Sequence, residues 1–385
     1  MTKIMILVGI LLMMLFIIGC GNRPCFEQTV VFTSGIDGYH TYRIPALVVT
    51  SKGTILAFCE GRKKQRGDTG DIDLLLKCSE DDGRSWSKQQ VIWDDQENAC
   101  SNPSPVVDVK TSKIWLLMTW NLGEDHEREI IRKESKNTRR VFVSSSQDDG
   151  ISWTQPFEIT ETTKDSTWGW YATGPGHAIQ LKYGPNKGRL VAPCDHSYDD
   201  PGGSIADGPF EYGSHIIYSD DHGTTWKLGG VIHPKVNECE VVELADRKGT
   251  IRINMRSYFD RNLRAQAISC DGGMTWSEPV DAADLIEPVC QASIVRFTEE
   301  ELHDNNRILF CNPASENREK LTIKMSYDEG KTWPVHRLLH NGPSAYSDLA
   351  VSKDLDVYCL YECGKENPYQ TISFAKFNLE WLMDK

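Results

Sequence analysis

The chain contains no Gly/Ser-rich or Pro-rich stretch that would mark a flexible linker between domains. It also has no paired Cys-x-x-Cys spacing of the kind that binds structural metals, so neither a metal nor a cofactor is expected. Positive charge is outnumbered by negative charge, with 42 lysines and arginines against 55 aspartates and glutamates. A formal net charge of −13 argues against nucleic acid or an anionic lipid surface as a partner. An anionic small ligand would therefore need a local cluster of arginines.

Long hydrophobic runs are scarce as well, and the longest one spans Ile4 to Ile18. It is shorter than the roughly 20 residues of a membrane-spanning helix, but it fits the core of a signal peptide. Gly19-Cys20 follows, as bacterial lipoprotein processing requires. We therefore expect residues 1–19 to be a signal peptide, Cys20 to be lipidated and residues 20–26 to form a tether. The protein would be an exported, membrane-anchored lipoprotein, periplasmic or on the cell surface. The alternative is an ordinary signal peptide with an incidental cysteine.

Eleven cysteines remain beyond Cys20, and this odd number has no metal-ligand spacing. Several lie in apolar, strand-like runs, among them Cys59, Cys78, Cys239 and Cys359. Buried free thiols are the preferred interpretation. Disulfides remain an alternative in an exported protein.

One eight-residue pattern, Ser-x-Asp-x-Gly-x-x-Trp, occurs five times, with starts 50 to 73 residues apart. The copies are Ser79 to Trp86, Ser146 to Trp153, Ser219 to Trp226, Ser269 to Trp276 and Ser326 to Trp333. Aspartate followed by glycine favours a tight turn, and the tryptophan can anchor it by packing. A calcium-binding interpretation is weak because the ligand series of an EF-hand is missing. A repeat of this length is typical of propeller blades.

Strand-like segments flank each repeat in sets of four. In the first set they are Ile44 to Val49, Thr54 to Glu60, Ile72 to Cys78 and Lys88 to Trp93. The same order begins again near Pro103, Pro175, Glu238 and Gln291, whereas the stretch from Tyr346 to Phe377 supplies only three strands. Glu27 to Phe32 is the natural fourth strand of that last set. We therefore predict an all-β, six-bladed β-propeller over residues 27–385, a single domain closed by its N-terminal strand.

Strands of a blade alternate in direction, so the start of the first strand and the end of the second share one face of the disc. Nine polar residues fall on that face, while the five aspartate turns fall on the other. They are Arg43, Glu60, Arg62, Asp68, Glu238, Arg256, Arg318, Tyr346 and Glu362. Any one of these charges could be an ordinary solvated loop residue, but together they indicate a site at one mouth.

The segments that carry these residues resemble the bacterial and animal exo-sialidases. They are Tyr42-Arg43-Ile44-Pro45, the aspartate turns, Asn237-Glu238-Cys239, Asn254-Met255-Arg256-Ser257, Asn312-Pro313 with Arg318, and Tyr346-Ser347-Asp348-Leu349. The resemblance covers about Gly35 to Glu362. It implies a retaining exo-α-sialidase that removes terminal α-linked sialic acids from glycoproteins, glycolipids and oligosaccharides, and we expect it to act as a monomer.

By this resemblance, Arg43, Arg256 and Arg318 would bind the carboxylate of the sialic acid, and guanidinium groups suit that task through paired, charge-assisted hydrogen bonds. Glu362 would orient Arg43. Glu60 and Arg62 are expected among the substrate-binding residues.

The same resemblance assigns Tyr346 as the nucleophile, Glu238 as the carboxylate that activates it and Asp68 as the general acid and base. A neutral phenol avoids the repulsion that an attacking carboxylate would meet at an anomeric carbon bearing its own carboxylate. Sialidases with a tyrosine nucleophile are a known exception among glycosidases. A free phenol ionises near pH 10, so it needs an adjacent base. The sequence leaves Asp71 open as the acid, although the spacing from Arg62 favours Asp68.

Other interpretations stay open at this point. The segment Thr167 to Tyr171 would form either an aromatic platform for substrate or packing between blades, and the charged segment Asn121 to Arg139 either a solvated loop or a rim of the site. A sialic acid lectin could keep the arginines but would not need Tyr346, Glu238 and Asp68 together. Transfer instead of hydrolysis, release of an anhydro sugar, or a related nonulosonic acid as substrate would use the same residues. A non-catalytic scaffold is the weakest alternative.

Overall fold

The computed structural model describes residues 23–384, and strands make up most of its regular structure. Helices are short: α1 (Glu127–Arg132), α2 (Thr160–Thr163), α3 (Leu379–Met383) and the 3₁₀ turn η1 (Ile205–Asp207). Within residues 23–384, no helix has the length and apolar character needed to cross a membrane. The predicted signal peptide and Cys20 lie outside the described residues.

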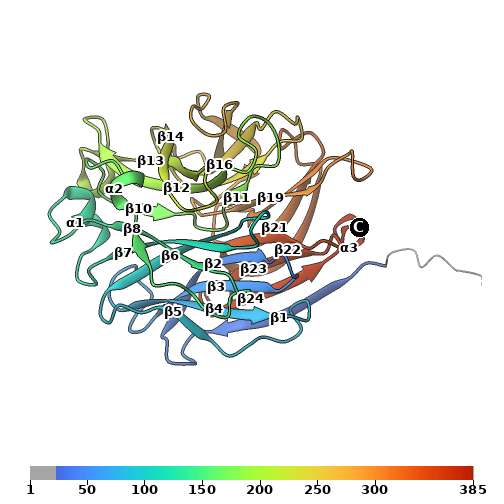
Figure 1. The fold of residues 1–385 in the computed structure, drawn as a ribbon, viewed down its shortest axis with the longest axis horizontal. Helices are drawn as coiled ribbons and strands as arrows, with labels where there is room; N and C mark the ends of the chain where they lie inside the picture. The colour runs from blue at the N-terminus through green and yellow to red at the C-terminus, as the bar shows by residue number, and fades with distance from the viewer. Residues whose placement is uncertain (1–22, 385) are drawn as a thin grey trace, which may run out of the picture.

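Antiparallel sets of four strands follow one another along the chain (Figure 1). The first set is β2 (Thr41–Val49), β3 (Ile55–Arg62), β4 (Ile72–Ser79) and β5 (Gln90–Trp93). The second is β6 (Ala99–Val107), β7 (Ile114–Asn121), β8 (Arg140–Ser146) and β9 (Phe157–Glu158). A single parallel bridge between Ile72 and Ala99 joins these two sets. The four strands predicted for the first set are confirmed within a few residues.

The third set differs from the prediction because its first strand is split. It consists of β10 (Tyr171–Thr173), β11 (Ile179–Gln180), β12 (Leu190–Asp199), β13 (Phe210–Ser219) and β14 (Lys227–Ile232). The segment Gly174-Pro175-Gly176 interrupts the strand, since proline cannot donate to a ladder and both glycines have positive φ. The fourth set is β15 (Val236–Glu243), β16 (Ile251–Ser257), β17 (Leu263–Ser269) and β18 (Val280–Ile286).

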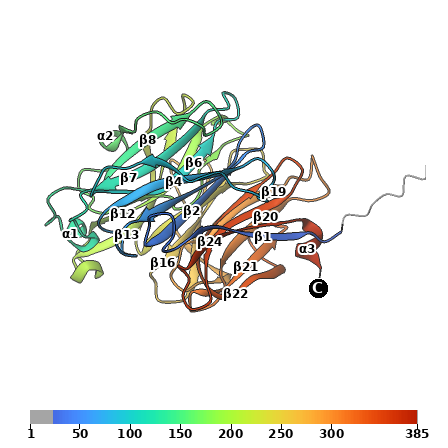
Figure 2. The same cartoon turned by 90° about the horizontal axis from the view of Figure 1, so that it is seen from below.

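The remaining strands form one seven-stranded sheet: β19 (Ser293–Thr298), β20 (Arg307–Pro313), β21 (Glu319–Ser326), β22 (Val335–Val351), β23 (Val357–Cys363), β24 (Thr371–Phe377) and β1 (Phe26–Thr33). The long strand β22 pairs with β21 through its first part and with β23 through its second. The predicted N-terminal strand is confirmed, because β1 pairs with β24 and lies beside it in Figures 1 and 2.

The first strand of each set contacts the first strand of the next, except between the third and fourth sets, where β12 makes the contact with β15. In chain order β2 contacts β6, and β6 contacts β10 and β11, while β12 contacts β15, β15 contacts β19, and β19 contacts β22. The series returns to its beginning, since β22 also contacts β2. Separate apolar clusters fill the spaces between neighbouring sets of strands. Eight of the eleven cysteines in the described residues are buried, and all eleven are free thiols, so the preferred interpretation of the cysteines is confirmed.

The five repeats form turns with the same hydrogen bonds. In the first, Ser79 Oγ contacts Asp81 Oδ1 at 2.9 Å and accepts from the Gly83 amide at 2.8 Å, and Asp81 Oδ1 accepts from the Ser85 amide at 2.9 Å. The other four turns repeat these contacts. Gly83 has a φ of +82°, and a Cβ there would lie 2.1 Å from the Phe374 ring, so only glycine fits.

Candidate active site

A cavity of about 630 Å³ opens where the first strands of the sets begin and the second strands end. Of the nine residues predicted for this face, all except Glu362 line it. Six arginines lie on its walls: Arg43, Arg62, Arg66, Arg139, Arg256 and Arg318. Five carboxylates lie there too: Glu60, Asp68, Glu127, Asp195 and Glu238. In a chain with a net charge of −13, such a local concentration of guanidinium groups marks a site for an anion.

Tyr346 and Glu238 contact each other at the floor of this cavity. Tyr346 is 5% exposed and lies near the start of the second part of β22, and its hydroxyl donates to Glu238 Oε1. Burial raises the pKa of the Tyr346 phenol well above its usual range, and the negative charge of Glu238 raises it further, while Arg256 and Arg318 act in the opposite direction. The phenol is therefore protonated at rest, with a carboxylate placed to accept its proton.

The three arginines predicted to bind a carboxylate all surround Tyr346. Arg256 Nη1 lies 3.3 Å from the Tyr346 hydroxyl and 2.8 Å from Glu238 Oε2. The guanidinium carbons of Arg43 and Arg318 lie 5.1 and 5.6 Å from the centre of the Tyr346 ring. Arg256 Nε is buried and has no hydrogen-bond partner among the described residues. The arrangement leaves donors free for an acidic group held beside the phenol.

Glu362 lies behind the cavity wall, fully buried at the end of β23. Its Oε1 accepts from Arg43 Nε at 2.7 Å and from the Ile44 amide at 2.9 Å, and its Oε2 accepts from the Tyr346 amide at 3.1 Å. One carboxylate thus holds the side chain of Arg43 and the backbone of Tyr346. The contact with the Tyr346 backbone was not predicted from the sequence.

Asp68 reaches the cavity from the loop after β3, and half of its side chain is exposed. Burial of its carboxyl acts to raise the pKa, but Arg62 at 2.6 Å and the charge of Arg43 outweigh this and lower it to about 2. Arg62 also donates to Glu60 Oε2 at 2.9 and 2.6 Å through Nε and Nη2. Asp68 is therefore ionised at rest, and it would need to lose this ion pair before it could donate a proton.

The alternative acid, Asp71, lies away from the cavity. Its Oδ1 contacts Lys63 Nζ at 3.1 Å, and neighbouring Asp73 is buried against Lys63 and the Tyr39 hydroxyl. Neither carboxylate lines the cavity. The geometry therefore favours Asp68 over Asp71.

Several polar residues of the cavity were missed from the sequence. Asp195 on β12 is buried, its Oδ1 accepts from Asn237 Nδ2 at 2.9 Å, and its Oδ2 has no partner among the described residues. Burial raises the pKa of Asp195 well above its usual range, and Glu238 adds to this. Glu127 on α1 accepts from the Tyr212 hydroxyl at 2.9 Å. Burial raises the pKa of Glu127, and the negative charge of Asp68 raises it further.

The structure shows which parts of two segments, Thr167 to Tyr171 and Asn121 to Arg139, reach the cavity. Within Thr167 to Tyr171 only Trp170 lines the cavity, with the Arg139 guanidinium 3.9 Å above its ring, whereas Trp168 stacks on His196 in the core. The charged segment between β7 and β8 is a rim of the site, because it carries Glu127 and Arg139 into the cavity.

The repeats and the all-β architecture define the class of protein, and residues 53–359 match the family described as BNR repeat-like domain. The chain belongs to the sialidase family. It is 33% identical over 372 residues to a sialidase of Micromonospora viridifaciens, covering 94% of this chain and 55% of that protein. It is 31% identical over 388 residues to Sialidase-3 of Mus musculus, covering 88% and 91%. The solved structure of Hadza microbial sialidase Hz136 matches with a TM-score of 0.79 at 29% identity, covering 92% of this chain and 68% of that one.

Proposed function

We propose that the protein is a retaining exo-α-sialidase that hydrolyses terminal α-linked sialic acids. One observation carries the proposal: three arginines surround a buried phenol whose hydroxyl donates to a carboxylate. Arg43, Arg256 and Arg318 would bind the sugar carboxylate through the donors that the protein leaves free. This would place the anomeric carbon over Tyr346.

In the first step Tyr346 attacks the anomeric carbon and passes its proton to Glu238, while Asp68 protonates the departing glycosidic oxygen. The bond to the aglycone breaks as the bond to the tyrosine oxygen forms. In the second step Asp68 removes a proton from water, which attacks the same carbon as the bond to the Tyr346 oxygen breaks, and Glu238 returns the proton to Tyr346. Two inversions give retention of configuration.

Asp68 must be protonated before it can donate a proton, and substrate binding would have to bring this about. At rest its ion pair with Arg62 keeps it ionised, with a pKa of about 2. A sugar hydroxyl that takes over the Arg62 contact, together with an aglycone that excludes water from the exposed side of Asp68, would favour the protonated form. Glu60 would keep Arg62 in place for that contact.

The same cavity offers acceptors for the rest of the sugar. Asp195 Oδ2 has no protein partner within residues 23–384, and Glu127 also lines the cavity. Carboxyl groups of this kind suit hydroxyl and amide groups of a polar acidic sugar. We assign them as candidate substrate contacts.

We further propose that residues 27–385 form a single six-bladed propeller. The returning series of contacts among the first strands and the pairing of β1 with β24 support it. The proposal of a lipid anchor at Cys20 rests on the sequence. The position of β1 is compatible with such an anchor. Its first residue, Phe26, pairs with Phe377 at the end of the sheet away from Tyr346. An anchor there would leave the cavity open to substrate.

The test is release of a fluorogenic aglycone from a sialoside by the wild-type protein and by Tyr346→Phe. Hydrolysis by the wild type that falls by several orders of magnitude in Tyr346→Phe is the expected result. Binding of sialic acid without any hydrolysis would indicate a lectin and overturn the proposal. Product NMR separates free sialic acid from a transfer product or an anhydro sugar, and a first product of β configuration would exclude retention.

A further inference from the structure

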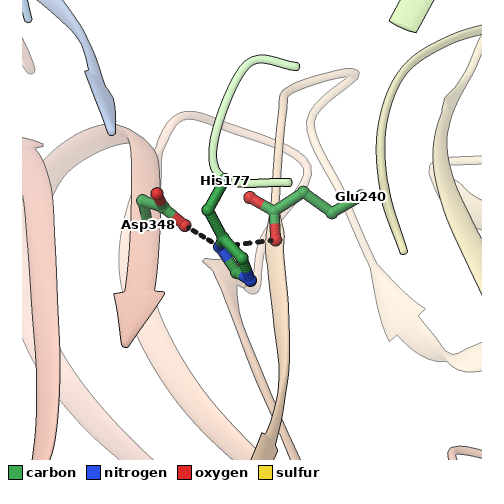
Figure 3. Close-up of side chains that lie close together, drawn as sticks. All are labelled: His177, Glu240 and Asp348. Carbon is green, nitrogen blue, oxygen red and sulfur yellow. Dashed lines mark hydrogen bonds and ion pairs between the residues drawn. The ribbon is translucent and has the colours of Figure 1, made fainter. Parts of the chain in front are cut away.

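Below the floor of the cavity lies a second group of ionisable side chains, which the proposed reaction does not use. His177, Glu240 and Asp348, here called the axial cluster, are all buried and point toward one another (Figure 3). His177 Nδ1 lies 2.7 Å from Asp348 Oδ1 and 3.8 Å from Glu240 Oε2. The three residues come from three different sets of strands, in the segment before β11, on β15 and on β22.

The axial cluster is bonded to the strands around it. Asp348 Oδ2 accepts from the Leu47 amide of β2 at 2.7 Å, and Glu240 Oε2 accepts from the Ile294 amide of β19 at 2.8 Å. Ser293 Oγ of β19 lies between the two acids, 2.9 Å from Glu240 and 3.1 Å from Asp348. These bonds tie β15, β19, β22 and β2 together at one level.

This level lies directly beneath the reacting pair. Glu240 follows Glu238 by two residues on β15, and Asp348 follows Tyr346 by two residues on β22, or roughly 7 Å of strand. The strands β15 and β22 belong to different sheets, and β19 contacts both of them. The contact between Tyr346 and Glu238 therefore depends on how far apart β15 and β22 are held, and the axial cluster spans that interval.

A fourth residue links the axial cluster to the backbone beside the nucleophile. Gln291 accepts from the Ser347 amide at 3.0 Å and donates to the Ser347 carbonyl at 2.9 Å. Its Nε2 also lies 3.3 Å from Glu240 Oε1. Gly176 has a φ of +105°, and a Cβ there would lie 1.9 Å from Glu240 Oε1, so glycine is required where this loop inserts His177.

Both acids of the axial cluster are held by several hydrogen bonds. Asp348 accepts from the Leu47 and Leu349 amides and contacts His177 Nδ1, and Glu240 accepts from the Ile294 amide, from Ser293 and from Gln291. Burial raises the pKa of Glu240 well above its usual range, and the charge of Asp348 raises it further. Together these hydrogen bonds hold β15 and β22 at a fixed separation at the level of the axial cluster.

We propose that His177, Glu240 and Asp348 are positioning residues that set the distance between Tyr346 and Glu238. The inference rests on the proposed function. A shift of about 1 Å in a reacting group can lower a rate by roughly 100-fold, so loss of this spacing affects turnover far more than binding.

The test compares Glu240→Gln, Glu240→Ala and Asp348→Asn with the wild type. The measurements are kcat and KM for a fluorogenic sialoside and the Kd of an unsaturated sialic acid analogue. Gln keeps the length of Glu240 and an oxygen that can accept the hydrogen bonds of Ile294 and Ser293, so its kcat is expected within about threefold of wild type. Ala at 240 and Asn at 348 are expected to lower kcat by roughly 10- to 100-fold with Kd changed less than about threefold. Ser293→Ala, a smaller change expected to fold, should lower kcat in the same direction.

Three results overturn the inference. They are an unchanged kcat in folded Glu240→Ala and Asp348→Asn, a weakening of analogue binding as large as the decrease in kcat, or equal decreases in kcat for Gln and Ala at position 240. The distance between Tyr346 Oη and Glu238 in crystals of wild type and Ser293→Ala gives a readout that needs no activity. An unchanged distance contradicts the inference. An inactive wild type would overturn only the proposed function.

Discussion

Glu362→Gln tests whether one buried carboxylate supports both substrate binding and the nucleophile. Glu362 accepts three hydrogen bonds, from Arg43, Ile44 and Tyr346. Glutamine keeps the size of the side chain, but its amide nitrogen must face one of these donors, and the charge that pairs with buried Arg43 is lost. Breaking a buried ion pair costs about 3–5 kcal/mol, and we take about 3 kcal/mol for a substitution that keeps the shape.

If that loss falls on the transition state, kcat/KM decreases by roughly 100-fold, since each 1.36 kcal/mol is a factor of ten. Kinetics with a fluorogenic sialoside measure this, and urea unfolding measures the stability of the same variant. Asp71→Asn is the matched control, because it makes the same chemical change in a carboxylate that pairs with Lys63 and not with Arg43. A folded Glu362→Gln with kcat/KM within about threefold of wild type would refute the reasoning.

Three further outcomes are expected. Arg256→Ala should raise KM and lower kcat/KM by roughly 100- to 1,000-fold, because it removes a charge-assisted contact to the sugar carboxylate; unchanged kinetics would remove Arg256 from the binding site. Asp68→Ala should lower kcat on a natural sialoside by roughly 100-fold but on a nitrophenyl sialoside by less than about tenfold, since a good leaving group needs no proton; equal losses would exclude Asp68 as the acid. Burial lowers the pKa of His196 and His215 well below 6.5 and that of His233 to about 4. The contribution of these neutral histidines to the free energy of unfolding is therefore fully present above pH 6.5 and is lost as the pH falls toward 4. His233→Gln should reduce the slope of unfolding free energy against pH between 6 and 5 by about 1.4 kcal/mol per pH unit, and an unchanged slope would contradict the assignment.

The sequence carried most of the fold because its signals are local and repeated. Each Ser-x-Asp-x-Gly-x-x-Trp turn makes its own hydrogen bonds, so the pattern alone marks the end of a third strand. The split first strand of the third set was not predicted. Gly174-Pro175-Gly176 interrupts that strand, and His177 just after it contacts Glu240 and Asp348, which lie far away in the chain.

The site was predictable where a residue type is unusual at its place in a strand, as with Arg43 and Tyr346. Asp195 carried a comparable signal, a carboxylate within the apolar strand β12, that was not used. Glu127 gave none, because a charged helix of six residues looks the same whether it faces solvent or a cavity. The ion pair between Arg62 and Asp68, which sets the charge of the proposed acid, depends on loop geometry that residue spacing does not specify.

The identity of the nucleophile is tested most directly by trapping the glycosyl-enzyme. A sialyl fluoride carrying a second fluorine next to the anomeric carbon reacts quickly in the first step and slowly in the second, so the intermediate accumulates. Mass spectrometry of the digested protein should then find one added sugar, on Tyr346, and none in Tyr346→Phe. A sugar attached to Glu238, to Asp68 or to any other residue would contradict the account.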